Sequence, residues 1–139
     1  MNKRVQDKIS QIERFLEELK EIIPDELNAY KTIEKKAACE RYAEKIIEAV
    51  TDLAFLAIKY KKLQIPEDDV DAFKILLDNK IIGKDEFEKL SQAKGMRNII
   101  AHEYGKIDDK IVFEALKNEL EGDVIKFIKK ISAVLSELR

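Results

Sequence analysis

The sequence predicts an all-α fold, an up-and-down bundle of about five helices. Apolar residues recur three and four positions apart over long stretches, which is the spacing of one face of a helix. The 139 residues include only four glycines and two prolines, whereas an all-β fold would need many more turn residues. Hydrophobic residues make up 45% of the chain and charged residues 39%, a balance that disfavours disorder.

The first half of the chain is expected to form three of these helices. One covers about residues 5–23, where apolar residues follow helical spacing until Pro24 stops the run. A longer helix covers about residues 33–63, which contain neither glycine nor proline. A short helix follows over about 66–79. Pro66 is expected in its first turn, next to acidic residues that suit the positive end of the helix dipole.

The second half is expected to form two more helices. The fourth runs from residue 84 or 85 to near residue 102, with Asp85 as its candidate cap and Gly105 just past its end. The fifth covers about residues 108–138, and Gly122 is a candidate kink within it. The residues expected to face inward along the fourth helix are Leu90, Ala93, Met96, Ile99 and Ile100.

Composition narrows the classes of function. The net charge of −2 gives no overall basic field to indicate nucleic acid, although a local basic groove is compatible with 26 lysines and arginines. The single cysteine, Cys39, can form no intrachain disulfide and fits a reducing cytoplasm. The charged N-terminus does not resemble a signal peptide, and no apolar run approaches the roughly 18 residues of a membrane span. We therefore expect one cytoplasmic domain over residues 1–139, with no membrane partner.

The stretch RNIIAHEYG, residues 97–105, contains the only histidine, His102. An arginine such as Arg97 offers a planar fork that matches phosphate oxygens, and histidine can move a proton near neutral pH. On an ideal helix these two side chains point about 140° apart. They converge within one chain only if the helix loosens before Gly105, and otherwise they converge across an interface. The amide oxygen of Asn98, four positions before the histidine, is placed to accept an imidazole N–H.

RNA cleavage without a metal needs both a base and an acid, and a single chain offers only one histidine for these two roles. A symmetric dimer would bring two histidines and two arginines to one seam. The plainer interpretation is that a lone histidine near a helix C-terminus is favourable through the helix dipole alone, since R-x-x-x-x-H is a weak pattern.

Other motifs in the sequence give little indication of a function. The sequence contains no paired cysteines, histidine cluster or glycine-rich phosphate loop, so we expect neither a metal site nor a cofactor. One polar stripe lies opposite the apolar side of the second long helix, and such a stripe is more often a solvated face held by ion pairs than a site. Its members are Arg41, Glu44, Glu48 and Asp52.

Residues 97–102 resemble the R-x-x-x-x-H signature of HEPN-domain proteins, and the H-x-Y that ends at Tyr104 resembles the HepT branch of that group. Three further segments agree in the expected order. They are ERYAEKIIEAVTDLA at residues 40–54, AFKILLDNKIIGKDEFEKL at residues 72–90, and YGKIDDKIVFEAL after the histidine. The resemblance therefore spans most of the chain.

The resemblance implies a HEPN-like helical dimer in which two Arg–His motifs face one cleft. It also implies a metal-independent ribonuclease toxin, with an MntA-like nucleotidyltransferase antitoxin that attaches AMP to the tyrosine. By position, Arg97 and His102 are then catalytic, Tyr104 is the modified residue, and Asn98 is the polar residue after the arginine. Three residues of the second long helix also match family positions, with less defined roles. They are Arg41, Glu48 and Asp52.

Three functions fit these observations. The first is an RNA-cleaving toxin of the HepT kind. The second is a non-catalytic helical module that binds a nucleotide or serves a nucleotidyltransferase as its substrate-binding partner. The third is a structural dimer without a site. The presence of Arg97, His102 and Tyr104 together favours the first function over the third.

Overall fold

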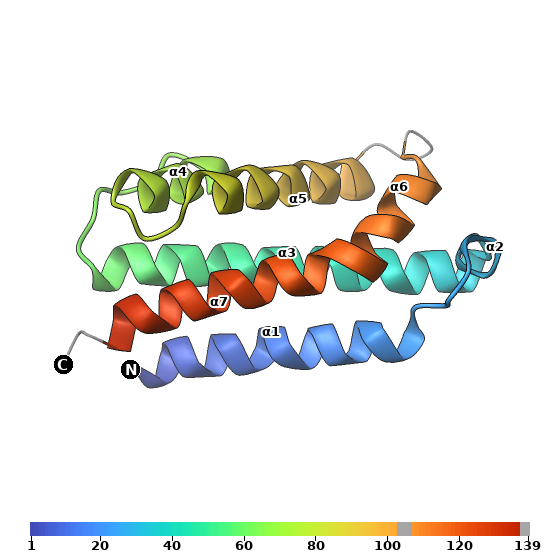
Figure 1. Cartoon of the computed structure of the whole chain (residues 1–139), viewed down its shortest axis with the longest axis horizontal. Coiled ribbons are helices and arrows are strands. Elements are labelled where there is room, and N and C mark those ends of the chain that lie inside the picture. The colour runs from blue at the N-terminus through green and yellow to red at the C-terminus, as the bar shows by residue number, and fades with distance from the viewer. Residues whose placement is uncertain (103–106, 137–139) are drawn as a thin grey trace.

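The computed structural model describes residues 1–102 and 107–136. Within these ranges the chain is helical and contains no strand, so the predicted all-α class is confirmed. Figure 1 shows the long helices lying along one common axis, as in an up-and-down bundle. The longer helices are α1 (Lys3–Ile22), α3 (Ile33–Tyr60), α4 (Asp69–Asp78), α5 (Lys84–His102) and α7 (Leu120–Ser136). The shorter segments are α2 (Leu27–Tyr30), α6 (Asp109–Glu114) and η1 (Ala115–Glu119).

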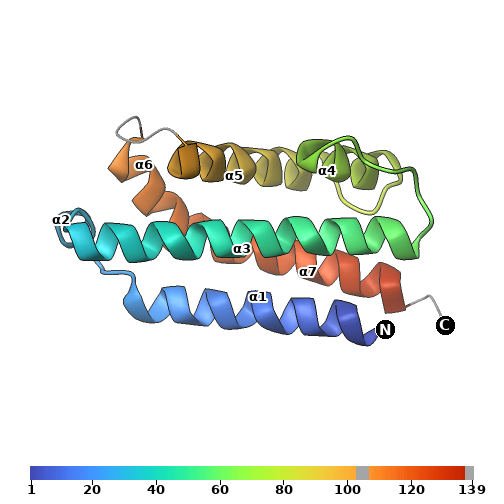
Figure 2. The same ribbon diagram turned by 180° about the vertical axis from the view of Figure 1, so that it is seen from behind.

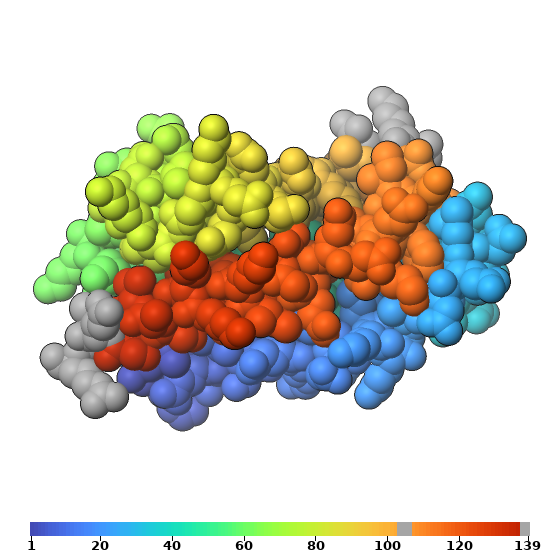
Figure 3. All heavy atoms as spheres, in the orientation of Figure 1, coloured from blue at the N-terminus to red at the C-terminus, as the bar shows by residue number. Residues whose placement is uncertain are grey.

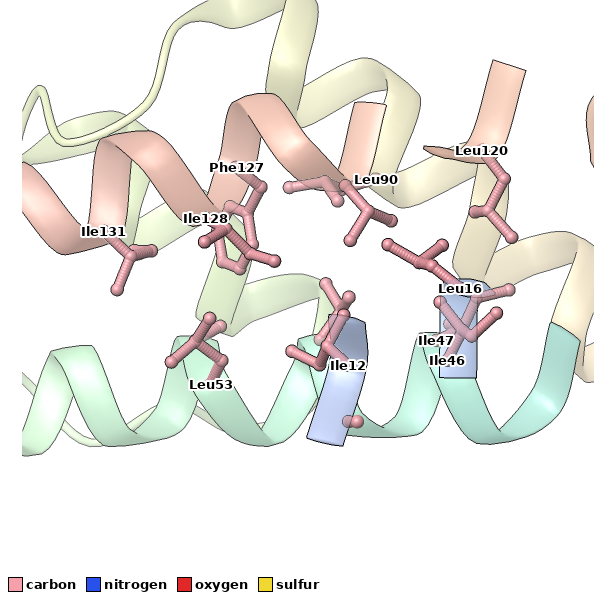
Figure 4. Packing of buried hydrophobic residues seen from close by; sticks show 14 of the residues in the cluster. Ile12, Leu16, Ile46, Ile47, Leu53, Leu90, Leu120, Phe127, Ile128 and Ile131 are labelled. Atoms are coloured by element: carbon pink, nitrogen blue, oxygen red, sulfur yellow. The ribbon is translucent and has the colours of Figure 1, made fainter. Parts of the chain in front are cut away.

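Helix α3 is the centre of the bundle, because α1, α4, α5 and α7 all pack against it. Its apolar residues are buried on almost every turn, and each large one contributes about 1.5–3 kcal/mol on burial. Figure 4 shows aliphatic and aromatic side chains from several helices meeting in this core. They include Ile12 and Leu16 of α1, Ile46, Ile47 and Leu53 of α3, Leu90 of α5, and Leu120, Phe127, Ile128 and Ile131 of α7.

One side of α3 is covered and the other carries the polar stripe. Figure 3 shows α7 filling the face between α1 and the α4–α5 pair, so that little of α3 is visible from there. From behind, Figure 2 shows α3 in front, with α1 on one side and α4 and α5 on the other. In the described part of the chain, no helix combines the length and the apolar character that a membrane crossing needs.

Helix α2 is not among the helices predicted from sequence. Its four residues are too few to display a helical period, so its position depends on tertiary contacts. Tyr30 is fully buried and packs against Phe113 of α6, with the two ring centroids 5.2 Å apart. This contact holds the connection between α1 and α3 against the start of the last helical segment.

The prediction that Pro66 lies in the first turn of the third helix is wrong. Helix α4 begins at Asp69, and Asp68 is its N-cap. The Asp68 carboxylate accepts the backbone N–H of Asp71 at 2.7 Å, which satisfies one of the amide groups left free at a helix start. The helix therefore starts three residues beyond the proline.

The predicted fifth helix is divided rather than kinked at glycine. Helix α6 passes into η1, a π-helical turn, before α7 continues. The wider turn inserts extra backbone and redirects the helix, and Figure 1 shows the chain bending there. Gly122 is exposed within regular α7, so the expected kink at this residue is wrong.

Helix α5 follows its predicted bounds and runs antiparallel to α3 (Figures 1 and 2). It begins one residue before Asp85, which therefore lies in the first turn instead of capping it. Ile100 is buried as expected, but Ile99 is 37% exposed, so its predicted inward orientation is wrong. Gly105, the expected end of this helix, lies outside the described residues.

Candidate active site

Arg97 lies on the side of α5 that faces α3. Its side chain is 20% exposed and its Nη2 forms an ion pair with Oε1 of Glu48 on α3. The Arg97 Nε is buried and has no hydrogen-bond partner among the described residues. The guanidinium is therefore held at one edge by a carboxylate, and its buried Nε–H has no acceptor among the described residues.

His102 is exposed and is the last residue of α5. The helix remains α-helical from Arg97 to His102, so it does not loosen between them. The two side chains consequently point about 140° apart and are separated by about 7.5 Å along the axis. Of the two arrangements left open by the sequence, the described residues favour convergence across an interface.

Asn98 is exposed beside this pair. Its Oδ1 accepts a long hydrogen bond of 3.4 Å from Nη1 of Arg97. No hydrogen bond links Asn98 to His102 in the described part of the chain, although the spacing suggested one. The amide oxygen instead lies beside a second nitrogen of the arginine.

The polar stripe of α3 divides between two neighbours. Glu48 pairs with Arg97 of α5, whereas Asp52 pairs with Lys8 of α1 through atoms 3.3 Å apart. Arg41 is exposed two helical turns before Glu48, towards the end of α3 that lies beside the end of α5 in Figures 1 and 2. The structure therefore brings Glu48 to the candidate site and directs Asp52 away from it.

One charged residue near the site is missed by the sequence reasoning. Lys94 lies one turn before Arg97 and is only 9% exposed. Its Nζ lies 2.6 Å from a carboxylate oxygen of Asp69 in the first turn of α4. The available signal was a lysine three residues before the motif arginine, but its partner is determined by how α4 packs on α5.

Tyr104 lies outside the described residues. The chain is described again from residue 107, where Asp108 caps α6 by accepting the N–H groups of Lys110 and Ile111 at 2.9 and 3.4 Å. The next residue, Asp109, forms an ion pair of 2.9 Å with Lys36 of α3 and raises the pKa of that lysine. The ion pair links the start of α6 to the first turn of α3.

Known proteins are similar to this chain over most of its length. Residues 6–131 match the family described as HepT-like ribonuclease. The mRNA nuclease HepT of Shewanella oneidensis is 26% identical over 133 residues, which are 96% of this chain and 99% of that protein.

Solved structures share the fold over nearly the full chain. The tri-AMPylated HEPN toxin of Shewanella oneidensis, in complex with MNT antitoxin, superposes with a TM-score of 0.89 at 26% identity, covering 96% of this chain and 99% of that one. The cytosolic protein YutE of Bacillus subtilis, at 19% identity and a TM-score of 0.79, shares the fold over 96% of this chain and 90% of its own. With the family match extending over most of its length, the chain belongs to the HepT-like ribonucleases.

Proposed function

We propose that this ribonuclease is the toxin of a toxin–antitoxin pair, that it cleaves RNA without a metal, and that it acts as a cytoplasmic homodimer. The observation that carries the proposal is that the two motif side chains of α5 point in different directions and have different surroundings. Arg97 is held facing α3 by Glu48, while His102 is exposed and points elsewhere. A second copy supplies the missing partner for each group. The cytoplasmic location agrees with Cys39, whose thiol is buried and free.

The chemistry follows from the two side chains. One histidine takes the proton of a ribose 2′-hydroxyl, whose oxygen then attacks the adjacent phosphorus. The bond from phosphorus to the 5′-oxygen breaks, and the histidine of the other protomer gives that oxygen a proton. The products are a 2′,3′-cyclic phosphate and a 5′-hydroxyl. Arg97 binds the scissile phosphate and stabilises the charge that develops on it.

Glu48 is a positioning residue in this proposal. An arginine side chain loses considerable rotamer freedom when it is ordered, and the ion pair with Glu48 meets that cost before substrate binds. Because one edge of the guanidinium is occupied by the carboxylate, the remaining N–H groups are the ones that meet phosphate. Asn98, beside Nη1, limits the same side chain from the other direction.

The proposed antitoxin is a nucleotidyltransferase that attaches AMP to Tyr104. Support comes from the similar Shewanella toxin, which is tri-AMPylated and bound to MNT antitoxin, together with the H-x-Y sequence of this chain. A phosphodiester-linked AMP adds a negative charge within two residues of His102. That charge pairs with arginine and repels the RNA backbone.

The test is RNA cleavage by the purified protein with and without a chelator, followed by end-group analysis. We expect cleavage to survive EDTA and to leave cyclic phosphate ends, and we expect Arg97→Ala or His102→Ala to lower the rate roughly a hundredfold or more. Cleavage that stops with EDTA, or a fully active His102→Ala protein, would contradict the mechanism. A folded chain that binds the nucleotidyltransferase but cuts no RNA would be the non-catalytic partner considered above.

A further inference from the structure

A groove of about 1220 Å³ lies between α1 and the C-terminal half of α3, and residues of the connection between α3 and α4 close one end. Figure 2 shows α1 and α3 side by side on this face of the molecule. Its lining contains more basic than acidic side chains, a local charge of +2 in a chain whose net charge is −2. The basic residues are Arg4, Lys8, Arg14 and Lys59, and the acidic ones are Asp7 and Asp52.

The groove lies on the α1 side of α3, whereas Arg97 lies on the α5 side. Asp52, at its near end, lies one helical turn after Glu48 on α3, about 6 Å along the axis. Glu48 holds Arg97, and Asp52 is paired with Lys8, which offsets its negative charge. An RNA strand whose phosphate is bound at Arg97 can therefore reach the basic groove by crossing α3 over about one helical turn.

The floor of the groove is partly aromatic and apolar. Phe55 is half-buried on the α3 wall of the groove, and Ile65 of the connection between α3 and α4 is 89% exposed. Ser10 and Gln11 add hydrogen-bonding groups along the α1 wall. A basic groove with an aromatic platform is the combination that binds single-stranded nucleic acid, since phosphates pair with the cations and bases stack on the ring.

We propose that this groove, lined by Arg4, Lys8, Arg14, Phe55 and Lys59, binds the single-stranded RNA that flanks the scissile phosphate. The proposal rests on the ribonuclease function proposed above and adds the path of its substrate. A second copy of the chain is a poorer occupant, because a two-fold contact centred here would bring the same basic side chains against one another.

The first test compares two charge-neutralising double variants in a His102→Ala background, where cleavage is blocked. Arg4→Gln/Lys59→Gln removes two exposed cations from the groove, and Lys126→Gln/Lys129→Gln removes two exposed cations from α7. Binding of a short unstructured fluorescent RNA is followed by anisotropy over a range of salt concentrations. We expect the groove variant to bind roughly tenfold more weakly and to lower the salt slope by about 1.4, and the α7 variant to remain near wild type.

A second test uses the absence of tryptophan from the chain. The Phe55→Trp protein carries one fluorophore in the groove, and the Phe87→Trp protein carries one on α5, outside the groove lining. We expect added RNA to quench the emission of the first protein by stacking and to leave the second unchanged. Quenching of both, or of neither, would contradict the proposed path.

Sedimentation of each variant measures its oligomeric mass. The proposal requires weaker RNA binding by the groove variant at an unchanged oligomeric mass. If the variant loses self-association instead, the groove is an interface between copies and the proposal is wrong. If the wild-type protein cleaves RNA but the groove variant and the α7 control variant bind RNA equally well, only the groove proposal is contradicted. A wild-type protein that neither binds nor cuts RNA contradicts the proposed function, and the groove with it.

Discussion

At the scale of single residues, the site depends on which carboxylate holds the arginine. Glu44, Glu48 and Asp52 share one face of α3, but only Glu48 forms the ion pair with Arg97. The Glu48 side chain is 45% exposed, so the pair contributes little to stability. We propose that the pair instead orients the guanidinium before substrate arrives.

We therefore predict that Glu48→Gln lowers kcat/KM for RNA cleavage by roughly tenfold or more, mainly through a higher KM, because the arginine that binds phosphate is no longer held. Glu44→Gln, a half-buried neighbour on the same helix, is the matched control and should cut like wild type. Steady-state kinetics together with thermal melting separate this effect from unfolding. Equal losses in both variants would remove Glu48 from the positioning role.

A second prediction at this scale concerns Tyr104, which the family resemblance marks as the modified residue. Tyr104→Phe lacks the hydroxyl that would accept AMP, so it should cut RNA like wild type and resist silencing by the nucleotidyltransferase. The measurement mixes partner, ATP and protein, then compares mass and cleavage. If the wild-type chain gains no AMP, or if Tyr104→Phe is silenced as fully as wild type, the assignment is wrong.

At the scale of helices, the placement of α5 decides where the motif points. Lys94 and its partner Asp69 tie the middle of α5 to the first turn of α4, one turn before Arg97. The lysine stem is buried, so it contributes packing as well as charge. The pair is therefore one of the contacts that hold α5 against α4.

We predict that Lys94→Ala lowers the free energy of unfolding by about 1–3 kcal/mol, because it removes a buried apolar stem and the ion pair with Asp69. Lys74→Ala breaks the exposed pair with Asp78 within α4 and should cost less than about 0.5 kcal/mol. Urea unfolding of both proteins gives the comparison. A loss in Lys94→Ala no larger than in Lys74→Ala would show that the pair does not anchor α5.

At the scale of the whole molecule, one chain presents an arginine and a histidine that diverge along a regular helix. A homodimer with its seam near residues 97–104 and part of α3 would bring two such motifs together. A specific interface of this kind buries at least about 1,000 Å² in total. Arg41 and His102 are exposed, and both belong to the surface that such an interface would cover.

We predict a dimer by sedimentation at micromolar concentration, and a specific nuclease activity that falls when the protein is diluted below the dimer dissociation constant. The dependence follows because neither chain alone supplies both a proton donor and a proton acceptor. A monomer at micromolar concentration, or an activity per chain that is independent of dilution, would contradict the shared site.

Local patterns were sufficient to predict the helical class and the bounds of α5, because helical periodicity is a property of short segments. They failed where a boundary depends on a competing local contact. The Asp68 cap, for example, moves the start of α4 past Pro66. They failed again for α2, which is too short to show a period and is held by Tyr30 in the core.

The choice among equivalent residues was left to tertiary structure. Glu48 and Asp52 are one turn apart on the same face of α3, and nothing in their spacing distinguishes them. Packing places α5 beside Glu48 and α1 beside Asp52, so one carboxylate joins the site and the other joins the basic groove. Such a choice depends on which helix lies across each turn, and that is a property of the packed bundle rather than of any segment within it.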